Sequence, residues 1–146
     1  KIVVSDLLLL GIDVETTNGV ITLNDIESPI INVDTTNGGI FGTVTSSETH
    51  FSTTNGVINI ELSAQTGEHD FDTTNGIVEL TLPTGTDIGY SIDLETTIGV
   101  IDTNLPNMDY SVDRIRNIIG ETDGFSSKDI QITINVDTTI GAIELN

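Results

Sequence analysis

A four-residue motif, Thr-Thr-Asn-Gly, recurs along this 146-residue chain at nearly constant spacing. A variant, Thr-Thr-Ile-Gly, occurs twice, and the segment Asn117–Gly120 is a degenerate copy midway between the two variants. The seven motif glycines are Gly19, Gly38, Gly56, Gly76, Gly99, Gly120 and Gly141. They lie 18 to 23 residues apart, which is the length of one coil of a solenoid, where each repeat packs on its neighbours. This repeat constrains the fold more than any other feature.

The residues around each glycine alternate between apolar and polar. Five positions before the glycine, every copy has an apolar residue: Val14, Val33, Phe51, Phe71, Leu94, Ile115 and Val136. Two positions after it, every copy has Ile or Val except the degenerate one, which has Thr122. Alternation with period two indicates a strand, and no segment keeps the 3.6-residue period of a helix. We therefore expect a strand, a bend at the glycine and a second strand in each repeat.

Asn-Gly also favours the two-residue turn of a β-hairpin, so an antiparallel meander is the alternative fold. The whole motif recurs once per repeat in the same polarity, however, and this favours equivalent strands stacked in parallel. The sequence thus predicts an all-β fold, a single-stranded parallel β-solenoid (β-helix) of about seven coils of 18–23 residues, in one domain spanning residues 1–146. Residues 1–11 are expected to be the remnant of a preceding coil or an N-terminal edge. A start at Lys1 indicates either a processed mature protein or a slice of a longer one.

Parallel stacking converts each motif position into a column of side chains about 4.8 Å apart. The outward position four residues before the glycine is mostly acidic: Glu15, Asp34, Ser52, Asp72, Glu95, Arg116 and Asp137. Because stacked like charges repel, we interpret Arg116 as charge relief between Glu95 and Asp137, and Arg114 as facing Asp93. An exposed pair contributes less than about 1 kcal/mol, so local charge balance is favoured over a ligand site at these arginines.

The residue just before the glycine changes from an amide to an apolar side chain along the sequence. The series is Asn18, Asn37, Asn55, Asn75, Ile98, Ile119 and Ile140. Stacked asparagines satisfy one another and the backbone of the bend, and stacked isoleucines pack equally well, which predicts a structural ladder. The alternative is an exposed apolar stripe near the C-terminal end.

Composition excludes several classes of partner. The formal net charge is −19, from 23 acidic and 4 basic residues, whereas binding to nucleic acid or to an anionic membrane requires clustered Lys and Arg. The longest apolar run, Leu7–Leu10 with two residues beyond it, is too short for membrane insertion. The chain has no cysteine, so it can form neither a disulfide nor a thiolate site.

The chemistry of catalysis is missing from the motifs, so we expect no enzyme and no catalytic, cofactor-binding or metal-binding residues. His50 and His69 lie in adjacent coils, but two imidazoles without a third ligand are interpreted as solvent-facing rather than as a zinc site. Diffuse Ca²⁺ binding stays an open alternative that we do not predict, since oxygen ligands suit Ca²⁺ but the calcium-binding nonapeptide of some solenoids is absent. The carboxylates considered for it are Asp70, Asp72, Asp87, Asp93 and Glu95.

The pattern apolar-acid-Thr-Thr-Asn-Gly-apolar-Ile, which spans Val14–Ile21 in the first copy, resembles that of the bacterial and archaeal putative-adhesin domain family. The resemblance covers essentially the whole chain. It implies a single-stranded parallel β-helix with one such motif per coil, and it supplies no catalytic residues. The isoleucines that replace asparagine in the later copies depart from the family pattern.

These observations predict a non-catalytic structural or adhesin-like module, extracellular or at the cell surface. Open strand edges at both ends of a solenoid favour head-to-tail self-association into a fibre or array, while the acidic columns discourage lateral aggregation. The alternative is a binding module that adsorbs glycan or ice on the stacked Thr/Asn face. Only one threonine of each adjacent pair can face outward, which weakens a two-rank threonine surface.

Overall fold

The computed structural model describes residues 2–5 and 10–146, which form nine β-strands, a single-turn 3₁₀ helix and no α-helix. The strands are β1 (Ile2–Ser5), β2 (Ile12–Glu27), β3 (Ile30–Thr45), β4 (Glu48–Leu62), β5 (Gly67–Thr81), β6 (Ile88–Thr103), β7 (Met108–Arg114), β8 (Asn117–Thr122) and β9 (Ile130–Leu145). The 3₁₀ helix η1 (Phe125–Ser127) precedes β9. Six of the strands are 15 or 16 residues long, and each of these six carries a motif glycine.

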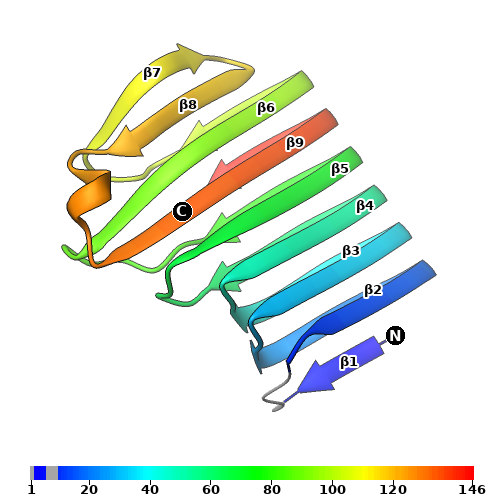
Figure 1. Cartoon of the computed structure of the whole chain (residues 1–146). Coiled ribbons are helices and arrows are strands. Elements are labelled where there is room, and N and C mark those ends of the chain that lie inside the picture. The colour runs from blue at the N-terminus through cyan, green and yellow to red at the C-terminus, as the bar shows by residue number, and fades with distance from the viewer. Residues whose placement is uncertain (1, 6–9) are drawn as a thin grey trace.

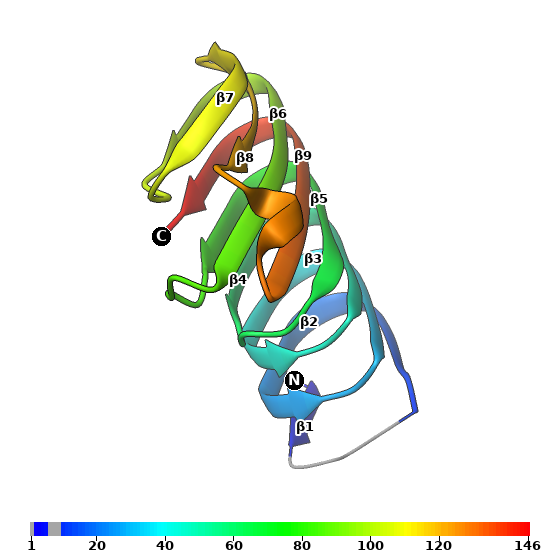
Figure 2. The ribbon, with the colours of Figure 1, turned by 60° about the vertical axis from the view of Figure 1, so that its left-hand side comes forward.

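Each long strand bends at its motif glycine and so forms one coil of the solenoid (Figures 1 and 2). We call the part before the glycine the first arm and the part after it the second arm; in β2 these are Ile12–Asn18 and Val20–Glu27. Short loops connect the second arm of each coil from β2 to β5 with the first arm of the next strand, whereas the β7–β8 hairpin and η1 lie between β6 and β9. Neighbouring coils pair in parallel along both arms, so the prediction of an all-β parallel β-solenoid is confirmed.

Six motif glycines form a column at the bend, in the spatial order Gly19, Gly38, Gly56, Gly76, Gly141 and Gly99. The backbones of adjacent coils approach so closely there that a Cβ atom on Gly56 would lie 1.5 Å from the carbonyl oxygen of Gly38. A Cβ atom on Gly38 would lie 1.6 Å from the carbonyl oxygen of Gly19. Since no side chain fits in this space, the bend requires glycine in each of the five coils from β3 to β6 and β9 that stack on a preceding coil.

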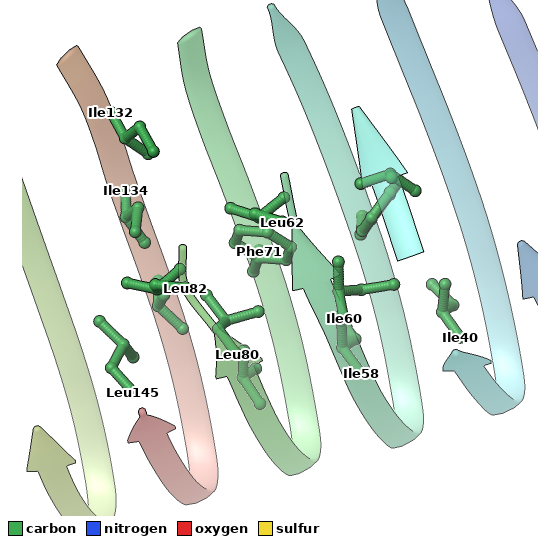
Figure 3. Packing of buried hydrophobic residues seen from close by; sticks show 14 of the residues in the cluster. Ile40, Ile58, Ile60, Leu62, Phe71, Leu80, Leu82, Ile132, Ile134 and Leu145 are labelled. Atoms are coloured by element: carbon green, nitrogen blue, oxygen red, sulfur yellow. The ribbon is translucent and has the colours of Figure 1, made fainter. Parts of the chain in front are cut away.

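The hydrophobic core lies between the two arms of the coils (Figure 3). Column after column of inward residues is buried, as alternation predicts for the positions five before and two after the glycine. Phe51 and Phe71 stack in neighbouring coils with ring centroids 5.6 Å apart in an edge-to-face arrangement. Because equivalent inward residues of neighbouring coils lie directly beside one another, they form one continuous core along the solenoid.

The order of the coils differs from the order of the sequence. The strands follow one another as β1-β2-β3-β4-β5-β9-β6-β8-β7, so the last strand, β9, lies between β5 and β6 (Figure 1). β9 pairs with both in the motif register: Gly141 lies beside Gly76 on one side and Gly99 on the other. The loop from β5 to β6 passes over one rung, meaning the position of one coil in the stack, and β9 fills that rung. The expectation that successive copies stack in sequence order is wrong from β5 onward.

The degenerate copy does not form a seventh stacked coil. β7 and β8 form an antiparallel hairpin in which Arg114 pairs with Asn117 across a two-residue turn, Ile115–Arg116. β8 then runs antiparallel to the first arm of β6, and Gly120 lies beside Ile92, outside the glycine column. The solenoid therefore has six full coils with a hairpin over one end, and the assignment of Gly120 as a motif glycine is corrected.

At the opposite end of the solenoid, β1 pairs in parallel with the second arm of β2. Ile2 lies beside Ile21, in the register of a residue two positions after a motif glycine. β1 thus takes the place of one second arm beyond the first full coil.

Candidate binding surface

The outer face of the first arms carries two columns of polar side chains. In spatial order, the column four residues before the glycine is Glu15, Asp34, Ser52, Asp72, Asp137 and Glu95. The column six residues before the glycine is Asp13, Asn32, His50, Asp70, Asn135 and Asp93. No two carboxylates are adjacent in the second column, whereas the first column ends with three in a row. Repulsion between like charges is therefore concentrated at Asp72, Asp137 and Glu95.

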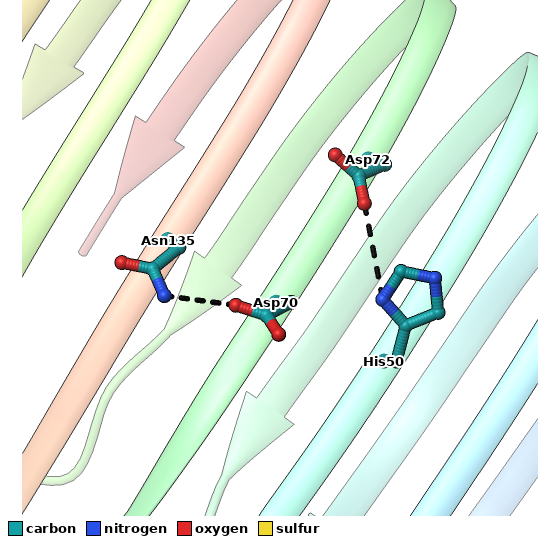
Figure 4. A network of polar contacts seen from close by, with 4 residues as sticks. All are labelled: His50, Asp70, Asp72 and Asn135. Atoms are coloured by element: carbon teal, nitrogen blue, oxygen red, sulfur yellow. Dashed lines mark hydrogen bonds and ion pairs between the residues drawn. The ribbon is translucent and has the colours of Figure 1, made fainter.

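Side chains of the second column contact two of the carboxylates (Figure 4). Asn135 donates a hydrogen bond of 2.8 Å from Nδ2 to Oδ1 of Asp70, and Nδ1 of His50 lies 3.8 Å from Oδ2 of Asp72. Burial raises the pKa of Asp72, His50 lowers it, and the neighbouring carboxylates raise it further. Burial, and then the charges of Asp93 and Asp70, raise the pKa of Asp137. The surface favours a partner that brings positive charge or hydrogen-bond donors to these carboxylates.

The structure does not give the arginines the place expected from the sequence. Glu95 lies directly beside Asp137, with no arginine between them, because β9 is inserted next to β6. Arg114 and Arg116 lie instead at the turn of the β7–β8 hairpin, where both are exposed. Their interpretation as charge relief within the acidic column is therefore corrected.

A polar groove crosses four coils beside the acidic column. It has a volume of about 270 Å³ and is lined by residues of β4, β5, β9 and β6, all of which are Ser, Thr, Asp or Glu. Asp72, Asp137 and Glu95 contribute carboxylates to it, and the exposed threonines Thr54 and Thr139 contribute hydroxyls. The groove runs across the strands, so it presents the same chemistry again at each rung.

The bend itself exposes two further columns. The second threonine of each motif is exposed in all six coils: Thr17, Thr36, Thr54, Thr74, Thr139 and Thr97. Beside it, Asn37, Asn55 and Asn75 each donate a hydrogen bond of 3.0 to 3.1 Å from Nδ2 to Oδ1 of the asparagine one coil earlier, beginning at Asn18. The amides therefore form a chain that fixes their orientation.

The apolar part of the same column is shorter than the sequence suggested. Ile140 follows Asn75, and Ile98 follows Ile140. Ile119 is not in this column, because it lies in the antiparallel strand β8, beside Asp93 of β6. Ile98 and Ile140 are 56% and 47% exposed, so this end of the bend presents the apolar stripe that was the alternative interpretation.

The two histidines lie on opposite faces of the first arms. His50 is half-exposed on the outer surface, whereas His69 is buried in the core, with Nδ1 3.0 Å from Oγ1 of Thr49. Burial lowers the pKa of His69 to about 4, and the charge of Asp70 opposes that shift. The solvent-facing interpretation is therefore wrong for His69. Its odd spacing of seven residues before Gly76 is the signal that could have placed it inside.

Three or more metal-ligating side chains do not converge anywhere in the part of the chain that the structure describes. Asp70, Asp72, Asp93 and Glu95 lie on the outer face of the first arms, and Asp87 precedes β6 in a loop. The absence of catalysis and of a cofactor stays a prediction. Among the described residues, no helix has the length and apolar character needed to cross a membrane.

Comparison with known proteins shows a likeness of fold to a solved structure. No family model matches the chain, and no curated protein matches its sequence. The structure is similar to that of a putative cell adhesion protein from Clostridium sporogenes, with 16% sequence identity and a TM-score of 0.59. The match covers 80% of this chain and 55% of the other, so this chain spans about half the length of that protein. At this identity the likeness shows a shared fold alone.

The buried imidazole predicts a specific pH dependence of stability. Because the pKa of His69 is about 4 in the folded chain and about 6.5 when unfolded, its contribution is complete above pH 6.5 and is lost as the pH falls toward 4. The loss amounts to about 3 kcal/mol of unfolding free energy. Urea unfolding between pH 4 and 7 should show a shallower pH dependence for His69→Gln than for the native chain.

His50→Gln is the matched control, since it removes an exposed imidazole from the neighbouring coil. Carboxylates that contact neither histidine keep their surroundings in all three proteins, so the part of the slope that is lost in His69→Gln but kept in His50→Gln is assigned to His69. Equal slopes for His69→Gln and the native chain would contradict the account.

Proposed function

We propose that this chain is a non-catalytic, adhesin-like module, extracellular or at the cell surface. It binds its target through the exposed threonine and asparagine columns at the bend and through the adjoining polar groove. The observation that carries the proposal is the groove itself, which repeats hydroxyls and carboxylates across β4, β5, β9 and β6. The shared fold with a protein described as a putative cell adhesion protein supports the adhesin-like part of the proposal.

The chemistry of the groove favours a glycan. Carboxylates accept hydrogen bonds from sugar hydroxyls, and threonine hydroxyls both donate and accept them. Asn37, Asn55 and Asn75 each use only one of their two amide N–H groups within the column, so the other can reach a ligand. Because the side chains are held by in-register strands, little conformational entropy is lost on binding. A concave groove also fits a polymer chain better than the flat face of an ice crystal.

Bulky substitutions in the groove test this proposal. Thr74→Tyr with Thr139→Tyr fills the groove with two rings, and it should weaken glycan binding on a glycan array and by calorimetry at least about tenfold, or about 1.4 kcal/mol. Thr17→Tyr with Thr36→Tyr is the matched control, because these threonines are in the same exposed column on β2 and β3, outside the groove. An array without any bound glycan, or equal losses in both double variants, would rule out the groove as the binding site. Thermal hysteresis would indicate ice adsorption instead.

Self-association is a second candidate function, favoured by unpaired strand edges at both ends of the solenoid. Among the described residues, nothing pairs with the outer edge of Ile12–Asn18 in β2 or with that of Ile98–Thr103 in β6. The hairpin β7–β8 lies where the first arm of a stacked copy would lie. A head-to-tail contact at that end therefore engages the second arm alone unless the hairpin moves.

Electron microscopy and sedimentation of the purified chain test this second candidate. Head-to-tail association predicts filaments or short rods whose length grows with protein concentration. Added salt should promote them, because it screens the repulsion between subunits of charge −19. Monodisperse monomers at high concentration and at every salt concentration would exclude it.

A further inference from the structure

At the β6 end of the solenoid, a further strand covers the first arm of the last coil but not its second arm. β8 pairs with the first arm of β6 over Ser91–Glu95. Beside the second arm of β6, Ile98–Thr103, β9 pairs with one edge, and no described residue pairs with the other. That outer edge presents backbone N–H and C=O groups in the geometry of a strand that awaits a neighbour.

This edge has few of the features that usually protect an exposed strand. Natural edge strands are blunted by charged side chains, proline or bulges. Ile98–Thr103 has one charged residue, Asp102, and its side chains Ile98 and Val100 are 56% and 58% exposed. By contrast, the unpaired arm of β2 at the other end carries the exposed acids Asp13 and Glu15. The two ends of the solenoid therefore differ in how open they are to strand addition.

The hairpin turn brings positive charge to the start of the same edge. The backbone N–H of Thr96 donates a hydrogen bond of 3.0 Å to the carbonyl oxygen of Arg116, which fixes the turn beside the bend of β6. The turn presents Arg114 and Arg116 on either side of Ile115, which is 75% exposed. Neither guanidinium has an ion-pair partner among the residues that the structure describes. These are two of only four basic residues in a chain of net charge −19.

We propose that the outer edge of Ile98–Thr103 and the Arg114–Arg116 turn together form a docking site for an extended, acidic peptide segment of a partner protein. The segment adds as a parallel strand of about six residues, roughly 20 Å long, and supplies the missing second arm of the last coil. Every second arm runs away from the bend, so the first residues of a parallel segment lie at the turn. Acidic residues at that end therefore meet the two arginines.

The chemistry of the site selects this occupant. Only an extended backbone satisfies the row of unpaired N–H and C=O groups along a strand edge, so a helix does not fit. The exposed faces of Ile98 and Val100 add apolar contact beside the backbone pairing. This inference goes beyond the proposed function, because the site lies at the end of the solenoid and needs neither a glycan in the groove nor association between copies.

A synthetic peptide with the sequence of one of the chain's own second arms tests the inference. The probe has two aspartates followed by the sequence of Gly76–Thr81, and its counterpart has two lysines in place of the aspartates. Fluorescence anisotropy, at a protein concentration where sedimentation gives a monomer, should show saturable binding of the acidic peptide. The lysine peptide should bind at least about tenfold more weakly.

Variants of the protein locate the site. Val100→Glu should lower the affinity for the acidic peptide at least about tenfold. Val20→Glu, at the equivalent exposed position of β2, should leave that affinity unchanged. Arg114→Glu with Arg116→Glu should reverse the preference toward the lysine peptide. Circular dichroism and urea midpoints establish that each variant is folded.

Three results would overturn the inference. The first is no saturable binding of the acidic peptide. The second is an equal loss of affinity for that peptide in Val100→Glu and in Val20→Glu. The third is a peptide that fails to bind while Val100→Glu dissociates an oligomer of the native chain, since the edge would then be an interface between copies. None of these results bears on glycan binding in the groove.

Discussion

The close approach of backbones at the glycine bend is the constraint on which the rest of the structure depends. From Gly19 to Gly141 in the stack, the carbonyl oxygen of one motif glycine occupies the space that a Cβ atom would take in the next coil, as at Gly38 and Gly56. This contact locks adjacent coils into one register. Once the glycines are superposed, every other motif position is superposed too, because the arms on both sides pair in parallel without a shift over the motif.

Superposition determines both the core and the surface. Inward positions become continuous apolar columns, whereas outward positions become columns of like polar groups that must tolerate one another. The asparagines do so through hydrogen bonds from the amide of one coil to the amide of the next, and in the column of Asp70 an asparagine or histidine separates the carboxylates. The longest run of stacked carboxylates is Asp72, Asp137 and Glu95, and the polar groove lies there. The candidate site is thus the place where stacking brings the most carboxylates side by side.

Much of the fold could be predicted from the sequence because parity relative to the glycine decides which residues face inward. The same rule applies to His69, whose odd spacing from Gly76 places it in the core despite its polarity. The place of β9 could not be predicted, since its Thr-Thr-Ile-Gly motif fits any rung equally well and loop geometry decides the order. The hairpin could not be predicted for a different reason. Its Ile115–Arg116 turn has no Asn-Gly sequence, and Gly120 with the apolar residues before it resembles a copy of the repeat motif. The groove and the uncovered second arm of β6 both follow from those two features of the tertiary structure.

Engineered disulfides test in-register stacking with β9 between β5 and β6 most directly, because the chain has no cysteine of its own. The account predicts that Asn75→Cys with Ile140→Cys forms a disulfide readily, since these exposed residues are direct neighbours in adjacent rungs about 4.8 Å apart. Asn75→Cys with Ile98→Cys should not form one, since Ile140 lies between them and their separation is about 10 Å. Rapid crosslinking of the second pair, and none of the first, would contradict the account.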